Sequence, residues 1–409
     1  MANVAILGYG TVGSGVFETI GMNAGDIEAR LPGGLRVTRV LDLRDFPGDP
    51  AEGILTHDFN DILTDGGITV VAEVMGGVGA AYAFTKQLLA AGKSVVTSNK
   101  ELVAKHGAEL IALAAANGVS YLFEASVGGG IPIIRPLTRA LTADAILGVT
   151  GILNGTTNYI LTRMTRESAA YADVLKDAQA LGYAEADPTA DVEGHDAQRK
   201  LAILLSLAVR KQVDSDAIET KGISGVTAED IAYATAFGGA VKLLAAGRVE
   251  NGRVCARVAP VVVADGHPLA MVNDVFNAVF VEGNAVGELM FYGRGAGKLP
   301  TASAVVGDLV EAAQAMAEKR SVSIVWDADK QPVEPFASLR ERRMFRVRGV
   351  MLPVMEGYSE PVVGINANEY AMLSPALTAA EWEAEKARLL AFDEVEAVFG
   401  ETIALFETV

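Results

Sequence analysis

The sequence predicts an α/β protein that begins with a doubly wound parallel sheet, continues with an α+β domain and ends with a small module. Three observations predict this fold class. The chain has 409 residues, too many for one ordinary core. Short apolar strands alternate with helical patterns up to about residue 126, as in consecutive βαβ units. From about Leu141 this alternation ends, and hydroxyl and amide side chains separate the apolar runs.

Composition restricts the class of function. The net charge of −17 and the pI near 4.8 argue against nucleic acid or an anionic membrane as the main partner. The single cysteine, Cys255, excludes an internal disulfide framework and fits a reducing compartment. No basic segment precedes the first apolar strand, and no apolar stretch approaches about 20 residues. We therefore expect a cytoplasmic protein without a signal peptide or membrane span.

The first expected strand leads into a glycine turn and a helix. Residues 3–20 read NVAILGYGTVGSGVFETI, which places Gly8, Gly10 and Gly13 at GxGxxG spacing. The first glycine permits the turn, the second lets a pyrophosphate approach the backbone, and the third lets the helix pack on the strand. Because strand, glycines and helix come in the required order, the pattern favours a Rossmann-type dinucleotide site over a simple tight turn.

The second strand should be LRVTRVLDL, which reaches Asp42. An acidic side chain at this point can accept hydrogen bonds from ribose hydroxyls, which favours NAD. Arg44 lies two residues further on and could instead pair with a 2′-phosphate. The Gly- and Pro-bearing segment 21–34 also makes the distance from the glycine turn longer than usual. The choice between NAD and NADP therefore stays open.

Three further strands, ITVVAEVMGG, KSVVTSNK and VSYLFEAS, alternate with the helical patterns AAYAFTKQLLAAG and ELVAKHGAELIALAAANG. Ligands of doubly wound sheets bind at the carboxyl ends of the strands. The stretch TSNK lies at such an end, so Ser98 and Lys100 are candidates for contact with cofactor or substrate. A solvated lysine before a helix is the equally good alternative for Lys100.

The stretch EASVGGGIPI combines a carboxylate, Glu124, with three consecutive glycines. An irregular loop of this kind exposes backbone carbonyls, and hard cations such as Na⁺ or Ca²⁺ accept carbonyl and carboxylate oxygens. A hinge between domains that binds no ion is the alternative. The later stretch GILNGTTNYILTRM suits either a strand-to-helix cap or a polar substrate pocket.

Residues 185–200, EADPTADVEGHDAQRK, crowd five carboxylates before an apolar helix. A calcium loop starting at Asp187 fails, because Val192 replaces the required glycine and Gln198 the closing glutamate. A solvated acidic loop is the second interpretation. The third is an active site whose carboxylates hold an ammonium group, while Lys200, one helical turn after Asp196, exchanges a proton with a hydroxyl. His195 is more typical of a polar surface residue.

Taken in order, these motifs resemble homoserine dehydrogenase over roughly residues 1–320. The stretches that carry the resemblance are GYGTVGSGV, EVMGGV, KSVVTSNKELVAKHG, FEASVGGGIPI, GILNGTTNYILTRM, ALGYAEADPTADVEGHDAQRKLAIL, KGI and FYGRGAGKLPTASAVVGDLV. The resemblance is to the monofunctional enzyme. It implies NAD(P)-dependent interconversion of L-homoserine and L-aspartate 4-semialdehyde, in threonine, methionine and isoleucine biosynthesis. The expected domains are 1–135 for the dinucleotide, 136–320 for catalysis and dimerisation, with its last helix returning to the first domain, and 341–409.

The resemblance also implies roles for individual residues. Lys200, Lys100 and Asp196 would be catalytic, with Lys200 as proton donor or acceptor. The substrate would contact Glu185, Asp191, Asp196, Lys200 and Thr156, with Asn154 and Gly155 completing the pocket. The cofactor would contact Gly8, Gly10, Thr11, Val12, Gly13, Asp42, Arg44, Ser98, Lys100, Gly182 and Gly297. A sodium ion would bind Glu124 and the carbonyls of Val127, Gly129 and Ile131. Asp187, Glu193 and His195 have no assigned task.

The last part of the chain departs from the family. Many relatives end in a regulatory ACT domain with a D-x-P-G turn, which PVMEGYSEPVVG replaces here. We expect residues 341–409 to form a shortened ACT-like module, which makes threonine feedback doubtful; a tail that packs on a second subunit is the alternative. A homodimer or homotetramer is expected. Another semialdehyde dehydrogenase and a dinucleotide-sensing regulator are the competing functions, but the first has no need of the Glu185–Lys200 spacing and the second no need of two lysines.

Overall fold

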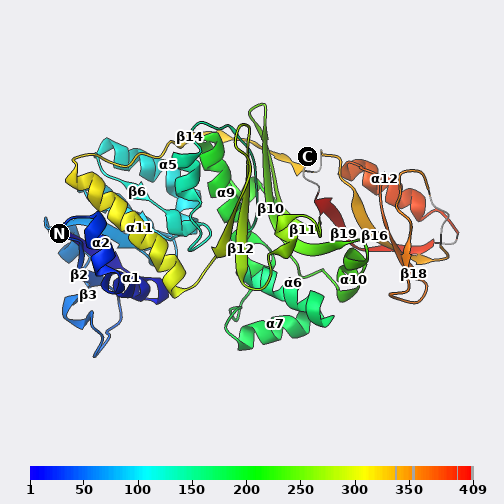
Figure 1. Ribbon diagram of the computed structural model, residues 1–409, viewed down its shortest axis with the longest axis horizontal. Helices are drawn as coiled ribbons and strands as arrows, with labels where there is room; N and C mark the ends of the chain where they lie inside the picture. The colour runs from blue at the N-terminus through cyan, green and yellow to red at the C-terminus, as the bar shows by residue number, and fades with distance from the viewer. Residues whose placement is uncertain (337–338, 352–354, 394, 407–409) are drawn as a thin grey trace. The chain divides into compact units, whose positions relative to one another are not determined.

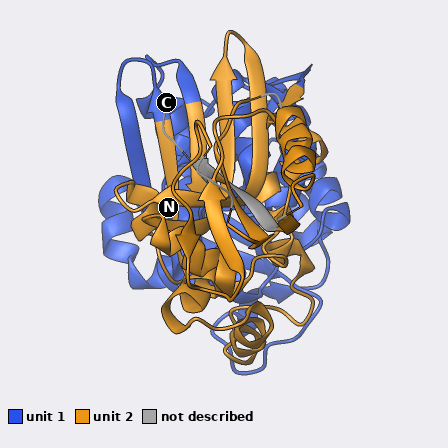
Figure 2. Ribbon diagram, turned by 90° about the vertical axis from the view of Figure 1, so that its right-hand side faces the viewer, with its two compact units in different colours: residues 1–147, 199–215, 282–332 blue, residues 148–198, 216–281, 333–409 orange. Residues whose placement is uncertain are grey.

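The computed structural model describes residues 1–336, 339–351, 355–393 and 395–406, and the chain divides into two compact units (Figures 1 and 2). Unit 1 comprises Met1–Leu147, Arg199–Ser215 and Glu282–Pro332. Unit 2 comprises Gly148–Gln198, Asp216–Val281 and Val333–Val409. Both units are therefore assembled from separate stretches of sequence.

The sheet of unit 1 is parallel throughout, with the strand order β3-β2-β1-β4-β5-β6. This is the order of dinucleotide-binding doubly wound sheets, and the predicted fold class is confirmed. Val4, Ile6, Val70 and Val95 of the central strands are fully buried, as in parallel sheets covered by helices on both faces. The strands are β1 (Ala2–Leu7), β2 (Leu35–Leu41), β3 (Leu55–Thr56), β4 (Ile68–Glu73), β5 (Ser94–Thr97) and β6 (Tyr121–Leu122).

The helices of unit 1 connect these strands and add one late element. Segment 21–34, which lengthens the distance to Asp42, contains a short helix, α2, that the sequence pattern did not indicate. Helix α11 packs against α1, where a Cβ on Gly15 would lie 2.8 Å from the carbonyl oxygen of Lys298 (Figure 1). The helices are α1 (Thr11–Met22), α2 (Ala24–Arg30), α3 (Asn60–Leu63), α4 (Gly79–Ala90), α5 (Lys100–Ala116) and α11 (Lys298–Ala317). Unit 1 also holds β8 (Lys211–Val213), β13 (Gly287–Arg294) and β14 (Asp327–Gln331).

Unit 2 is built on a sheet in which neighbours follow the order β12-β7-β10-β11-β19-β16-β18-β17. Its longest pair, β10 (Gly239–Glu250) and β11 (Arg253–Ala264), is an antiparallel hairpin closed by Asn251 and Gly252. Both turn residues have positive φ, 51° and 78°, as the two-residue Asn-Gly hairpin turn requires. The core beside this hairpin includes Ile152, Leu244, Val261, Val263 and Leu269.

The remaining elements of unit 2 precede and follow this hairpin. The helices are α6 (Gly155–Glu167), α7 (Tyr171–Ala180), α8 (Thr189–Val192), α10 (Ala228–Ala236) and α12 (Ala379–Leu389). The other strands are β7 (Ile146–Ile152), β9 (Glu219–Thr220), β12 (Phe276–Gly283), β15 (Val333–Pro335), β16 (Arg343–Gly349), β17 (Val362–Val363), β18 (Glu369–Leu373) and β19 (Val395–Phe406). Helix α9 (His195–Val209) runs along the chain from unit 2 into unit 1.

The last elements, β16 to β19 with α12, are joined to the rest of unit 2 in two ways. Strand β19 pairs in parallel with β11, so the sheet continues into the C-terminal part of the chain. Arg346 of β16 contacts Asp230 of α10 at 3.0 Å and Glu369 of β18 at 2.9 Å, and all three side chains are buried. Among the described residues no helix lies between β16 and β17. Across the described part of the chain no helix is both long and apolar enough to span a bilayer.

Candidate active site

A cavity of about 670 Å³ opens at the carboxyl ends of the strands in unit 1. Four residues expected to bind the cofactor line it: Gly8, Gly10, Asp42 and Arg44. The other lining residues are Leu41, Leu43, His57, Phe59, Val74, Met75, Gly76, Ala80 and Phe84. The sequence analysis missed this apolar wall, although VMGG directly follows a buried strand and so offered a signal.

The glycine turn has the geometry that its spacing predicted. Gly8 has φ +92°, a conformation that favours glycine. A Cβ on Gly13 would lie 1.9 Å from the carbonyl oxygen of Gly8, so only glycine allows α1 to approach β1 this closely. Thr11 is the first residue of α1 and Val12 the second, so their amides belong to a helix N-terminus that suits a phosphate.

Asp42, directly after β2, is fully occupied by hydrogen bonds. Its Oδ1 accepts from the amide and Nε of Arg44, at 3.0 and 2.9 Å. Its Oδ2 accepts from Arg44 Nη2 at 3.0 Å and from the amide of Tyr9 at 2.7 Å. The Arg44 guanidinium holds the pKa of the Asp42 carboxyl far below its usual range. These four bonds use the acceptor capacity of a carboxylate, while the Arg44 side chain remains 61% exposed.

His57 joins this edge of the cavity. Its Nδ1 lies 2.6 Å from the carbonyl oxygen of Asp42, and its Nε2 lies 3.1 Å from Oδ1 of Asp45. The Asp42 carbonyl, and then the Asp45 carboxylate, raise the pKa of His57 above its ordinary value. The cavity edge therefore carries two exposed groups, Arg44 and His57, that can be cationic.

Lys100 is the first residue of α5, and Ser98 lies between it and the end of β5. The side chain of Asn99 caps this helix by accepting from the amide of Leu102 at 3.0 Å. Lys105 and, more weakly, Arg199 of α9 lower the pKa of Glu101. Glu101 and Arg199 both belong to unit 1. Lys100 and Lys200 likewise both belong to unit 1.

The triple-glycine loop packs tightly within unit 1. A Cβ on Gly129 would lie 2.5 Å from the carbonyl oxygen of Gly295, and one on Gly130 would lie 2.9 Å from Pro300. The Glu124 carboxylate accepts from the amides of Ile133, Ile134 and Arg135 at 2.6–2.8 Å. Close packing and a carboxylate that caps the next turn therefore explain much of this motif without an ion.

The backbone carbonyl oxygens expected to bind sodium are nevertheless still available to a cation. Val127, Gly129 and Ile131 are buried, and within the described residues no hydrogen bond ends on their carbonyl oxygens. Three of the roughly four lone-pair directions of the Glu124 carboxylate are used. No group of three or more His, Cys, Asp or Glu side chains suited to a metal occurs in the described part of the chain. A cation here would depend mainly on backbone carbonyls.

In unit 2 the side chain of Asn154 brings two predicted carboxylates together. Its Nδ2 donates to Asp191 Oδ1 at 2.8 Å and to Asp196 Oδ2 at 2.9 Å. Its Oδ1 accepts from the amide of Thr157 and so caps α6. The motif GILNGTTNY is thus a strand-to-helix cap whose amide also reaches the acidic loop.

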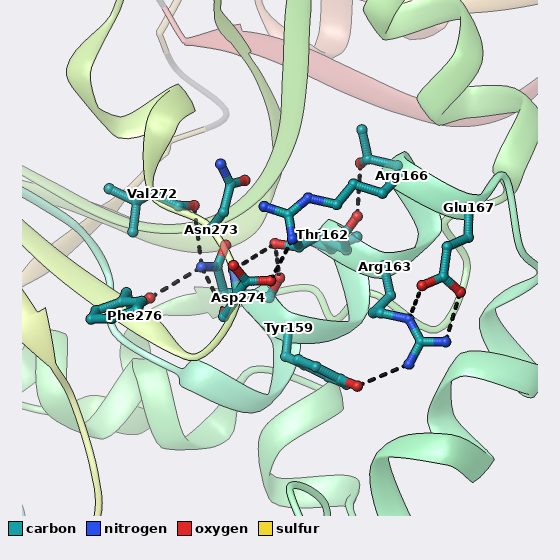
Figure 3. Close-up of polar contacts among 12 residues, drawn as sticks. Tyr159, Thr162, Arg163, Arg166, Glu167, Val272, Asn273, Asp274 and Phe276 are labelled. Carbon is teal, nitrogen blue, oxygen red and sulfur yellow. Dashed lines mark hydrogen bonds and ion pairs between the residues drawn. The ribbon is translucent and has the colours of Figure 1, made fainter.

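The first turns of α6 are fixed against the loop Val272–Phe276. Asn158 Nδ2 donates to the carbonyls of Val272, Asp274 and Phe276 at 3.1–3.2 Å. Figure 3 shows Thr162 and Arg166 at the same loop, where Arg166 contacts the Asp274 carboxylate at 2.8 Å. This packing holds the helix start, and with it Asn154, Gly155 and Thr156, in place on the sheet.

The other predicted substrate residues lie on both sides of that cap. The hydroxyl of Thr156 donates to the carbonyl of Tyr183 at 2.7 Å. Glu185 is exposed, two residues beyond Tyr183, and Gly182 is an exposed glycine with φ +75° after α7. Gly297 belongs to unit 1 and precedes α11 with φ +122°. Gly182 and Glu185 belong to unit 2.

Asp196 and Lys200 are one turn apart on α9, which begins at His195. Both side chains are buried, with exposed fractions of 3% and 8%. His195 is exposed, as predicted. Asp187 accepts from the amide and hydroxyl of Thr189, so this carboxylate shapes its own turn. The loop therefore divides into a solvated part and a buried part that ends in an ammonium group.

Comparisons with known proteins agree on one family. The family model for homoserine dehydrogenase matches residues 132–310, and that for the homoserine dehydrogenase NAD binding domain matches residues 8–124. Homoserine dehydrogenase of Bacillus subtilis is 45% identical over 75% of this chain and 72% of its own length. The structure of a homoserine dehydrogenase from Thiobacillus denitrificans, 37% identical, covers 99% of this chain and 98% of its own, with a TM-score of 0.87. A hyperthermophilic archaeal homoserine dehydrogenase mutant in complex with NADPH, 29% identical, covers 76% of this chain and 98% of its own, with a TM-score of 0.64.

Proposed function

The chain belongs to the homoserine dehydrogenase family, and from this premise we propose how its own residues carry out the reaction. The protein is an NAD(P)-dependent oxidoreductase that interconverts L-homoserine and L-aspartate 4-semialdehyde. One observation carries the assignment of roles. The Asn154 amide bridges Asp191 and Asp196, and Asp196 lies one helical turn before the buried Lys200.

The substrate ammonium group is held by the acidic end of this arrangement. Asp191, with Glu185, supplies carboxylate oxygens for the ammonium group, and Asp196 positions the substrate. Thr156, tied to the carbonyl of Tyr183, completes the polar wall. Because Asn154 donates to both aspartates, it separates two like charges by a fixed distance and reduces their repulsion.

Lys200 transfers the proton. The bound nicotinamide supplies the acceptor or donor of hydride. As the carbonyl forms, the homoserine hydroxyl loses its proton to the Lys200 amine, and in the reverse direction the ammonium group returns it. Lys100, the first residue of α5, contacts the reacting end of the substrate as a second cation.

Replacing Lys200 tests this assignment. Lys200→Met keeps the length of the side chain and removes the exchangeable proton, so turnover should fall by about 10²-fold or more. Affinity for the cofactor should change little. Lys211→Met, an exposed lysine beyond the same helix, is the control and should match the native enzyme. Reduction of NAD(P)⁺ by homoserine, followed by absorbance, measures the rate, and near-native turnover of Lys200→Met would refute the role.

For the cofactor, the arrangement at the cavity edge supports NADP(H) over NAD(H). The ribose hydroxyls of NAD need a free carboxylate, whereas Asp42 already accepts four hydrogen bonds. Arg44 and His57 offer positive charge to a 2′-phosphate. We infer that NADP(H) binds to this conformation directly, and that NAD(H) binds only when Arg44 moves away from Asp42.

A sodium ion is proposed at the triple-glycine loop, held by the carbonyls of Val127, Gly129 and Ile131 with one remaining direction of Glu124. The support is the set of buried carbonyls without a hydrogen bond. Such an ion would order the loop that packs on Gly295 and Pro300. It takes no part in proton or hydride transfer.

We place the enzyme in the cytoplasm, in threonine, methionine and isoleucine biosynthesis, as a homodimer or homotetramer.

We also propose that residues 341–409 are a shortened ACT-like module. Four strands and α12 support this proposal, while the absence of a helix between β16 and β17 among the described residues argues against threonine feedback. Calorimetric titration with threonine is expected to give no heat of binding. Saturable binding would show instead that the module still recognises the amino acid.

A further inference from the structure

Glu73 is a buried carboxylate at the carboxyl end of the unit 1 sheet, and none of the proposed steps uses it. It is the last residue of β4 and is fully buried. Its partner in register is Thr97, the last residue of β5. Burial raises the pKa of Glu73 to about 7, although the hydrogen bonds from Thr97 and Met75 act to lower this pKa. Burying a carboxylate costs free energy, so its presence at the ligand-binding end of the strands calls for an explanation.

The two oxygens of this carboxylate hold different partners. Oε1 accepts from the amide of Met75 at 2.9 Å. Oε2 accepts from the hydroxyl of Thr97 at 2.6 Å. Because the hydroxyl proton points to Glu73, the Thr97 oxygen is free to accept, and it accepts from the amide of Asn99 at 2.9 Å. Glu73 therefore fixes the direction of the Thr97 hydroxyl and, through it, the backbone at Asn99.

Asn99 extends this chain of hydrogen bonds in two directions. Its Nδ2 donates to the carbonyl of Gly77 at 2.7 Å, and its Oδ1 caps α5 at Leu102. The first residue of that helix is Lys100. The segment before Gly77 includes Val74, Met75 and Gly76, which line the nucleotide cavity. A closed set of hydrogen bonds thus connects the cavity wall to the start of the helix that carries Lys100.

We propose that Glu73 is a positioning residue for the reaction: acting through Thr97 and Asn99, it holds Lys100 in a fixed place relative to the cavity wall. The proposal rests on the role given to Lys100 above. A carboxylate suits this task because it accepts at both oxygens. Glutamine at position 73 accepts at one oxygen only, so either the Met75 amide or the Thr97 hydroxyl loses its acceptor.

Thr97→Val removes the hydroxyl at nearly constant shape, and Glu73→Gln removes one acceptor. Either change should lower kcat by about 10-fold to 100-fold, since misplacement by about 1 Å costs that much, while the Kd for NADP(H) should change less than about threefold. Thr97→Ser keeps the hydroxyl and should restore turnover. The control is Thr85→Val, because the Thr85 hydroxyl is equally buried but has no hydrogen-bond partner among the described residues. Its kcat should equal the native value.

Combined variants test the connection to Lys100. If the hydrogen bonds act as one chain, the double variant Glu73→Gln with Thr97→Val should have a kcat no lower than that of the less active single variant. Thr97→Val added to Lys100→Met should cost nothing more. The proposal is overturned if Thr97→Val keeps the native kcat, as Thr85→Val should. It is also overturned if the fold-losses of kcat in Thr97→Val and Lys100→Met multiply in the double variant. Full turnover of Lys100→Met alone would overturn the role of Lys100, and this proposal with it. If kcat falls in Lys100→Met but stays native in Thr97→Val, only the positioning role of Glu73 is overturned, and the role of Lys100 stands.

Discussion

At the scale of single residues, the proposed preference for NADP(H) rests on the contact between Asp42 and Arg44. Arg44 Cζ lies 5.1 Å from the centre of the Phe46 ring, so the guanidinium is held between a carboxylate and an aromatic face. A cation fixed in this way, with most of its surface exposed, needs little reorganisation to meet a phosphate. The sequence contained both Asp42 and Arg44, but it did not determine which of them would face the ligand.

Removing the cation should therefore change the cofactor preference. Arg44→Ala loses a charge-assisted hydrogen bond worth about 1.5–3 kcal/mol and frees Asp42 for ribose hydroxyls, so the KM for NADP should rise by about 10-fold to 100-fold. The KM for NAD should stay constant or fall. Arg36→Ala, an exposed arginine at the other end of β2, is the matched control. Equal effects of Arg44→Ala on both cofactors would contradict the assignment.

His57 should add a dependence on pH to the proposed preference for NADP(H). Asp42 and Asp45 raise its pKa, so the imidazolium that favours a 2′-phosphate persists to higher pH than in a free histidine and is lost as pH rises through that value. The advantage of NADP over NAD in kcat/KM should accordingly decrease with rising pH. His57→Gln should flatten this dependence, and His106→Gln, on α5, should leave it unchanged. A preference that is independent of pH in the native enzyme would exclude His57.

The residues of the site differ in how well the sequence indicated them. Gly13 was predictable because a fixed spacing implies close packing, and the Cβ distance of 1.9 Å confirms that reason. His57, Phe59 and Phe84 were not, because they reach the cavity from segments without a motif. The hydrogen bonds from Asn154 reach Asp191, which is 37 positions later in the sequence, and Asp196, which is 42 positions later. Local sequence patterns do not encode contacts over such separations.

At the scale of elements, the triple-glycine loop gives a test of the metal. If sodium binds the carbonyls of residues 127, 129 and 131, it binds the folded state only and should stabilise it by about 2.7 kcal/mol at 100 times its Kd. The midpoint of thermal unfolding should be higher in sodium chloride than in choline chloride of equal ionic strength, and removal of sodium should reverse the gain. Identical midpoints in both salts would leave close packing as the explanation of the glycines.

Element boundaries show where local patterns succeed. The predicted strand ending in VLDL stops at Leu41. Helix α2 was missed because its seven residues lie in a segment rich in glycine and proline. The β10–β11 hairpin was also missed, although Asn251-Gly252 between two β-branched runs is a strong hairpin signal.

At the scale of the whole molecule, the buried contacts of Arg346 connect the C-terminal elements to α10. Arg346→Met would leave Asp230 and Glu369 buried without this cation, and should lower the free energy of unfolding by about 3–5 kcal/mol. Arg388→Met is the control, because the Arg388 side chain is half exposed to solvent and its ion pair with Glu385 should contribute about 1 kcal/mol or less. Urea unfolding measures both variants. Equal losses would mean that the burial of the Arg346 contacts has no energetic weight.

The pairing of β19 with β11 has a consequence for how the protein is made. Residues 261–263 of β11 pair with residues 404–406 of β19, so the hydrogen bonds of this stretch wait for a much later part of the chain. Residues 254–258 of β11 pair instead with β9 and β15, which precede β19. Unit 1 likewise needs Glu282–Pro332 to complete itself. A ribosome adds about 5–20 residues per second, so the early strands spend seconds without their partners. The stretch 261–263 of β11 should thus stay unpaired until β19 has been made, and an unpaired strand edge is a place where another chain can add.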